Sequence, residues 1–187
     1  MYCMKIEKYS FLFLLLCLFF SSCKEVSFKE PQPAGVAALK TVPEKLHGRY
    51  QAGDNNNKED TDTLIIESWG YHFKDKDDKD WLGKGTLSDS LVIKFYQDYY
   101  FVNFRSGNQW VLRLVKQKAT GGLEFLSIDI ADDAKRKEIL RKMARKFKVT
   151  EVKKESDTFY QITPTKEQLM QLIREGYFTG VELGKIK

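Results

Sequence analysis

Between residues 91 and 130 four segments with strand composition are separated by short turns, and two of them, 91–96 and 110–116, alternate apolar and polar side chains. In the first segment Leu91, Ile93 and Phe95 share one face of an extended chain, while Lys94 lies on the other face. The turns contain glycine and polar residues, several of which tolerate positive φ angles. The pattern predicts an antiparallel meander of four β-strands over residues 91–96, 99–105, 110–116 and 123–130.

Three segments upstream also have the composition of strands, because they contain aromatic and β-branched residues between polar turns. They are residues 46–52, 63–67 and 69–73. With the meander they predict an antiparallel sheet of six or seven strands. A sheet of that size curls or packs against another layer to bury one face, so we expect a curved sheet or a small barrel over residues 45–130.

After residue 131 the apolar period changes from that of a strand to that of a helix. Asp132 or Asp133 can cap a helix N-terminus, where a carboxylate also interacts favourably with the helix dipole. Ile139, Met143 and Phe147 then recur at spacings that place them on one face of the helix. This stretch therefore predicts an amphipathic helix that packs on the sheet.

The end of the chain predicts a second helix after a hairpin. The hairpin is expected over residues 149–153 and 158–162, and Thr165 with Gln168 has the spacing of a capping box. The chain is therefore predicted to be α+β, with the antiparallel six- to seven-stranded curved sheet or small barrel followed by a helix–hairpin–helix tail over residues 131–187.

The N-terminus has the features of an export signal. Two lysines lie in the first eight residues, residues 11–20 are ten consecutive apolar residues, and two serines precede Cys23. Ten apolar residues are too few for a membrane-spanning helix, which needs about 20. A cationic start, a short apolar segment and small residues before a cleavage point are typical of a secretory signal peptide.

The four residues Phe20-Ser21-Ser22-Cys23 resemble the lipobox of gram-negative bacterial lipoproteins, with Phe where Leu is usual. The resemblance implies that the Cys23 thiol receives a diacylglycerol, that residues 1–22 are removed, and that the new amine is acylated. Two or more acyl chains anchor a protein stably in a membrane. Lys24 stands where inner-membrane lipoproteins usually have Asp, which favours the outer membrane and leaves the periplasmic face and the cell surface as alternatives.

Cleavage would leave Cys23 as the only cysteine of the mature chain. This excludes an intramolecular disulfide and a cysteine-ligated metal in the folded part. Residues 23–44 contain three prolines and one glycine without apolar periodicity, so we expect a lipidated cysteine followed by a flexible tether. Residues 45–187 are then expected to be a single α+β globular domain.

Positive charge is concentrated near the first predicted helix. Residues 131–187 carry 14 Lys and Arg against 9 Asp and Glu, whereas residues 24–130 carry 15 against 16. Four bases are predicted to project opposite the apolar stripe, and they are Lys137, Arg141, Arg145 and Lys148. Such a face can bind anionic lipid, polysaccharide or an envelope protein, or it can simply be solvated. We expect no nucleic acid partner, because an exported lipoprotein rarely meets one.

Aromatic side chains crowd the predicted sheet and could line a site for an apolar ligand or stack on sugar rings. The candidates are Tyr71, Phe73, Trp81, Tyr99, Phe101 and Trp110. Residues 46–130, with Gly48-Arg49-Tyr50 at their head, resemble the lipocalin-like small barrels of bacterial lipoproteins. That resemblance implies a carrier of an apolar or sugar ligand. The alternative is that these rings form core and cross-strand pairs.

Signals of catalysis are weak. The sequence lacks the motifs G-x-S-x-G and H-E-x-x-H and has only two histidines, His47 and His72. The acidic run 75–80 contains two lysines and lacks the central Gly of a calcium loop. We therefore expect no catalytic residue, no cofactor and no metal. The predicted function is a non-catalytic, membrane-anchored outer-membrane lipoprotein that binds or scaffolds an envelope component, with the ligand carrier and a motif-free hydrolase as alternatives.

Overall fold

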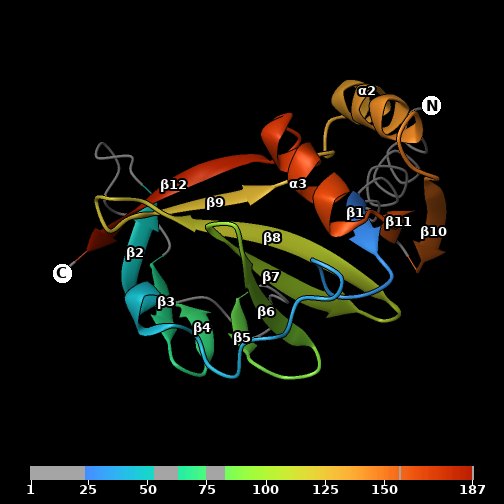
Figure 1. The fold of residues 1–187 in the computed structure, drawn as a ribbon. Coiled ribbons are helices and arrows are strands. Elements are labelled where there is room, and N and C mark those ends of the chain that lie inside the picture. The colour runs from blue at the N-terminus through green and yellow to red at the C-terminus, as the bar shows by residue number, and fades with distance from the viewer. Residues whose placement is uncertain (1–23, 53–62, 75–82, 156, 187) are drawn as a thin grey trace, which may run out of the picture.

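The computed structural model describes residues 24–52, 63–74, 83–155 and 157–186 (Figure 1). Cys23, Trp81 and the acidic run 75–80 lie outside these ranges. In chain order the elements are β1 (Lys24–Phe28), the 3-10 helix η2 (Glu44–Leu46), β2 (Gly48–Ala52), β3 (Leu64–Glu67), β4 (Gly70–Phe73), β5 (Lys84–Thr86), β6 (Leu91–Tyr96), β7 (Tyr99–Ser106), β8 (Gln109–Gln117), β9 (Leu123–Ser127), α2 (Asp133–Ala144), β10 (Thr150–Lys154), β11 (Asp157–Ile162), α3 (Lys166–Arg174) and β12 (Thr179–Ile186).

The predicted meander is present as β6, β7, β8 and β9, each paired antiparallel with the next. The turn between β6 and β7 has positive φ at both Gln97 and Asp98, which is the conformation of a two-residue hairpin turn. Gly107 and Gly121 have positive φ in the two following turns. These elements formed where they were predicted because their signals are local.

The fold class predicted from the sequence is wrong. The described strands form one open mixed sheet of 12 strands, ordered β10-β11-β1-β8-β9-β12-β2-β3-β4-β5, with β6 and β7 branching from β8. The parallel pair β1–β11 makes the sheet mixed. The expected six- to seven-stranded antiparallel sheet or small barrel therefore does not form, and its strands belong to one larger open sheet.

The helix–hairpin–helix tail does not form a separate unit either. The predicted hairpin is β10–β11, and β1 joins it to β8. The last strand, β12, inserts between β9 and β2. Most side chains of β12 are exposed, so its sequence carries no apolar alternation that could have predicted it. Backbone hydrogen bonds to two neighbours hold this strand in place.

The segment predicted to be a flexible tether is part of the domain. Val26 and Phe28 of β1 are buried, with 4% and 1% of their surfaces exposed. Beyond β1, the buried Asn103 side chain accepts a hydrogen bond from the Gln32 backbone N–H and donates one to the Gln32 carbonyl. The Lys94 ammonium donates to the Pro31 and Pro33 carbonyls at 2.7 and 2.9 Å. Hydrogen bonds from buried side chains of the sheet thus fix residues 31–33 against it.

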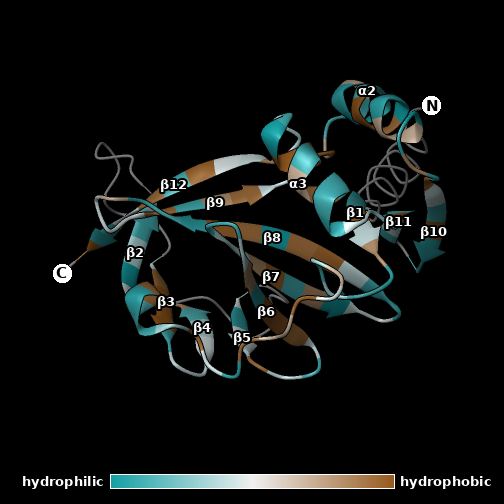
Figure 2. Ribbon diagram, viewed as in Figure 1, coloured by the Kyte–Doolittle hydropathy of each residue, from teal (hydrophilic) through white to brown (hydrophobic). Residues whose placement is uncertain are grey.

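Two apolar clusters cover the two faces of the sheet. Phe101 and Leu114 point into a cluster with Met143 of α2 and Leu169 and Leu172 of α3. Their strand neighbours point the other way, into a second cluster, which includes Tyr100, Val102, Phe104 and Val115. Figure 2 shows the apolar colouring along β7 and β8, the strands that contribute to both clusters. The alternation of a pleated strand therefore gives this sheet two buried faces.

The two helices begin where the sequence predicts. The Asp132 side chain accepts a hydrogen bond from the Lys135 backbone N–H and caps α2. Thr165 and Gln168 form the predicted capping box of α3. However, α2 ends at Ala144, so Phe147 and Lys148 lie beyond the helix.

Candidate functional site

Four bases on and just after α2 are exposed to solvent. Their side chains make no ion pair with any residue that the structure describes. We call this surface the α2 basic face, and it consists of Lys137, Arg141, Arg145 and Lys148. Met143, on the opposite side of the helix, is fully buried. The predicted division of α2 into a basic outer face and an apolar inner face is therefore present, and Figure 2 shows hydrophilic colouring over much of the helix.

The other bases of this region are neutralised locally. Each of the other bases donates a hydrogen bond to an acidic neighbour and lowers the pKa of that carboxyl group. The donors and their acidic partners are Lys142 with Glu138, Lys146 with Glu175, Lys135 with Asp129, and Arg136 with Asp133. The ion pairs are Lys135–Asp129, Arg136–Asp133, Lys142–Glu138 and Lys146–Glu175. The net positive charge of the region thus resides mainly on the α2 basic face.

The first turn of α2 lies beside the start of β1. The Lys24 ammonium is 3.5 Å from the Asp133 carboxylate, and Lys24 is in register with Thr158 of β11. Figure 1 shows α2 at the same end of the molecule as β1, β10 and β11. Because Lys24 directly follows Cys23 in the sequence, a lipid on Cys23 would be attached next to this helix.

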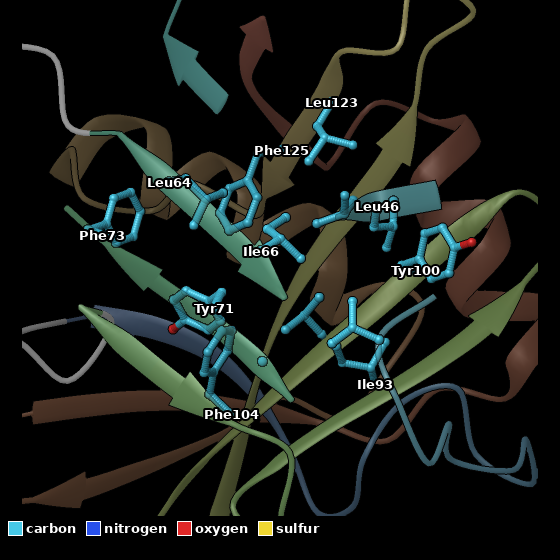
Figure 3. A pocket seen from close by; sticks show the side chains of 14 residues that line it. Leu46, Leu64, Ile66, Tyr71, Phe73, Ile93, Tyr100, Phe104, Leu123 and Phe125 are labelled. Atoms are coloured by element: carbon cyan, nitrogen blue, oxygen red, sulfur yellow. The ribbon is translucent and has the colours of Figure 1, made fainter. Parts of the chain in front are cut away.

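A second feature is an apolar cavity of about 120 Å³ on the other face of the sheet (Figure 3). Its 14 lining residues come from η2 and the loop before it and from β3, β4, β6, β7, β8 and β9. None of them is charged. Leu46, Leu64 and Ile93 point into the cavity from different elements, and their exposed fractions are 3%, 5% and 6%. The curled sheet therefore leaves a partly open space that its side chains do not fill.

The structure separates the six predicted ligand-binding aromatic residues. Tyr71 and Phe73 line the cavity. Phe101 is fully buried in the cluster beneath the helices, and Tyr99 and Trp110 pack against that cluster, so these three lie on the other face. The sixth, Trp81, lies outside the described residues. The predicted set therefore does not form one site.

Sequence reasoning missed most of the cavity lining. Tyr100, Phe104 and Phe125 are the other aromatic residues of the lining. A signal for Tyr100 and Phe104 was present, because residues 99–102 and 104 are apolar on both faces of the strand, which indicates a strand covered on both sides. The aliphatic Val42 had no such signal, because it precedes the first predicted strand. Leu46 was predicted to begin that strand, whereas the structure places it at the end of the 3-10 helix η2.

Both histidines make structural contacts. The His47 ring Nε2 donates to the Val42 carbonyl at 3.0 Å. The His72 ring stacks on Trp69, with 5.9 Å between ring centroids. Within the described ranges, no three His, Cys, Asp or Glu side chains gather as a metal site. Across the same ranges, no helix is long and apolar enough to cross a membrane.

Comparisons of the chain with models of protein families, with curated proteins and with solved structures find no match.

Proposed function

We propose that this chain is a non-catalytic outer-membrane lipoprotein, anchored through Cys23, whose α2 basic face binds phosphate groups at the membrane surface. The observation that carries the proposal is the position of this face. Two of the four bases, Lys137 and Arg141, lie on α2, whose first turn contacts Lys24, the residue after the proposed anchor. The other two, Arg145 and Lys148, follow directly after the helix, and all four lack an ion-pair partner among the residues that the structure describes. Anchor and basic surface therefore lie at the same end of the molecule.

The absence of a tether strengthens this argument. Since β1 begins at Lys24, acyl chains on Cys23 would hold the folded domain directly against the lipid head groups. A domain on a long flexible tether would sample many orientations, whereas a domain anchored at a strand end has few. The bases near the anchor would then meet the anionic surface without a further loss of translational freedom.

The contribution of these bases is measurable. Each base near an anionic membrane surface contributes about 1 kcal/mol to binding. The four bases of the α2 basic face together would contribute about 4 kcal/mol at low salt, or nearly 1000-fold in affinity. Ionic screening over about 8 Å at physiological salt reduces this attraction.

We expect the fourfold variant Lys137→Gln/Arg141→Gln/Arg145→Gln/Lys148→Gln to lose most of this binding and to keep its melting temperature nearly unchanged. Exposed charges contribute only about 0–1 kcal/mol each to folding. The measurement is co-sedimentation of the mature chain carrying Cys23→Ala with phosphatidylglycerol vesicles, at low and at physiological salt. Neutral phosphatidylcholine vesicles give the background.

A matched control removes the same charge elsewhere. The control positions are exposed and belong to the opposite half of the sheet or to its loops, and they are Lys40, Arg49, Lys74 and Lys84. Their fourfold Gln variant should bind anionic vesicles nearly as well as the parent protein. Equal loss in both variants would show that only net charge matters, and no loss in the α2 variant would show that this face is merely solvated.

A further inference from the structure

We infer that the cavity between β3–β4 and β6–β9 is a binding site for a small uncharged hydrocarbon, a ring or acyl-chain end of roughly six carbon atoms. This site is independent of the α2 basic face, because the cavity and α2 lie on opposite faces of the sheet. The inference rests on the size of the cavity, the chemistry of its walls and the burial of the residues that form them.

The size of the cavity distinguishes it from ordinary packing. Protein interiors pack as densely as organic crystals and contain few voids larger than a water molecule. This cavity has a volume of about 120 Å³, several times the volume of one water molecule. Ten of the 14 residues around it are buried, and they include Val102 and Val115 at 8% and 5% exposure. The other four, Ile66, Tyr71, Phe73 and Phe125, are half-buried, so the space is a deep pocket that is partly open to solvent.

The walls select the class of ligand. Water enters a cavity only where it finds two to four polar partners, and purely apolar cavities stay dry. Aliphatic side chains and aromatic rings form nearly all of this lining, and none of the residues carries a charge. A charged or sugar ligand would lose its hydration without compensation. A benzene-sized hydrocarbon would gain dispersion contacts with the apolar side chains of the lining.

Several separate elements enclose the site, so a ligand would contact both halves of the curled sheet. Figure 3 shows Leu64, Ile66 and Tyr71 of β3 and β4 on one side and Ile93 of β6 and Tyr100 of β7 on the other. Binding should therefore stabilise the association of β3–β4 with the meander. The stabilisation that the ligand produces should be largest in β3, β4 and the meander, and it should be absent from the cluster beneath α2 and α3.

The test is a methyl NMR titration of the exported full chain in lipid nanodiscs, with benzene in one arm and n-hexane in the other. We expect saturable shifts at the methyl groups of Leu64, Ile93 and Val102. The methyl groups of Leu169 and Leu172, in the other cluster, serve as controls within the molecule. Shifts with benzene alone assign the site to a ring, and shifts with hexane alone assign it to a chain. Absence of shifts with both, or equal shifts in both clusters, would overturn the inference.

A filled cavity gives a second test. Val102→Phe adds a ring to the wall and should weaken binding of the hydrocarbon at least tenfold. The control, Val152→Phe, makes the same change in the strand β10 at the far edge of the sheet and should leave binding unchanged. Unchanged binding in a folded Val102→Phe protein would assign the ligand elsewhere. If that variant does not fold, the wild-type titration still decides between the outcomes.

Discussion

A chain that begins at residue 45 is expected not to fold, although the sequence alone places the start of the domain there. The structure gives β11 only two partners among the described strands, β10 and β1. Removal of β1 would therefore disconnect this hairpin from the rest of the sheet. It would also leave the buried Lys94 ammonium without its two carbonyl acceptors, which is a costly loss for a charged group.

The measurement compares chains that begin at residues 24 and 45, by far-ultraviolet circular dichroism and by amide dispersion in NMR spectra. We expect native dispersion only from the longer chain. Burial already lowers the pKa of Lys94, so exposure of this group on truncation should return its pKa toward the ordinary value. Native dispersion in the shorter chain would show that residues 24–44 contribute little to the fold.

A single substitution tests the packing of β1 on the domain without removing the strand. Phe28→Ala in β1 is expected to lower the free energy of unfolding by about 3–5 kcal/mol, because it creates a cavity at a fully buried position. Val181→Ala in β12 is the control, since that side chain is 56% exposed and its loss should cost about 0.5 kcal/mol or less. Urea denaturation measures both. Similar values for the two variants would contradict the burial of β1.

Cys23→Ala is expected to release the protein from the membrane almost completely. The lipobox resemblance provides one acyl acceptor, the Cys23 thiol, and without it no acyl chain is attached to the mature chain. Loss of two or more acyl chains removes an anchor that is stable and leaves only the reversible attraction of the α2 basic face. Detergent-phase partitioning at high salt measures the anchor, because high salt screens that attraction.

Cys3→Ala is the matched control for the anchor, because Cys3 lies within the signal segment that cleavage would remove. It should partition with detergent as the parent protein does and should incorporate radiolabelled palmitate. If Cys23→Ala protein still enters the detergent phase at high salt, the anchor lies elsewhere in the chain. That result would contradict anchoring through Cys23. It would not affect the vesicle test of the α2 basic face, because that test uses unlipidated protein.

Helix caps and tight turns were predictable because a few neighbouring residues determine them. Asp132 and Thr165 cap their helices through hydrogen bonds that span three residues. Gln97 and Asp98 close a hairpin in which six residues on each side pair antiparallel. Of the α2 basic face, helical periodicity placed Lys137 and Arg141 opposite Met143, whereas Arg145 and Lys148 lie after the end of the helix, which the apolar periodicity placed too late.

The cavity was less predictable. Tyr71 and Phe73 were among the candidates, but the same reasoning also included Phe101, which lies on the opposite face. Adjacent aromatic residues in a strand always point to opposite faces, so Tyr100 and Phe101 cannot line one cavity. Composition alone does not show which face curls over a space, because that depends on the placement of β3 and β4 against the meander.

Local signals were sufficient to predict the meander β6–β9, the two capped helices and the charged outer face of α2. Three features depend instead on segments that are distant in the chain: β1 pairs parallel with β11, β12 lies between β9 and β2, and a cavity remains between β3–β4 and the meander. The strand pairings form through backbone hydrogen bonds between those distant segments. Every residue except proline can donate these bonds, so the side chains of β1 and β12 do not reveal their partners.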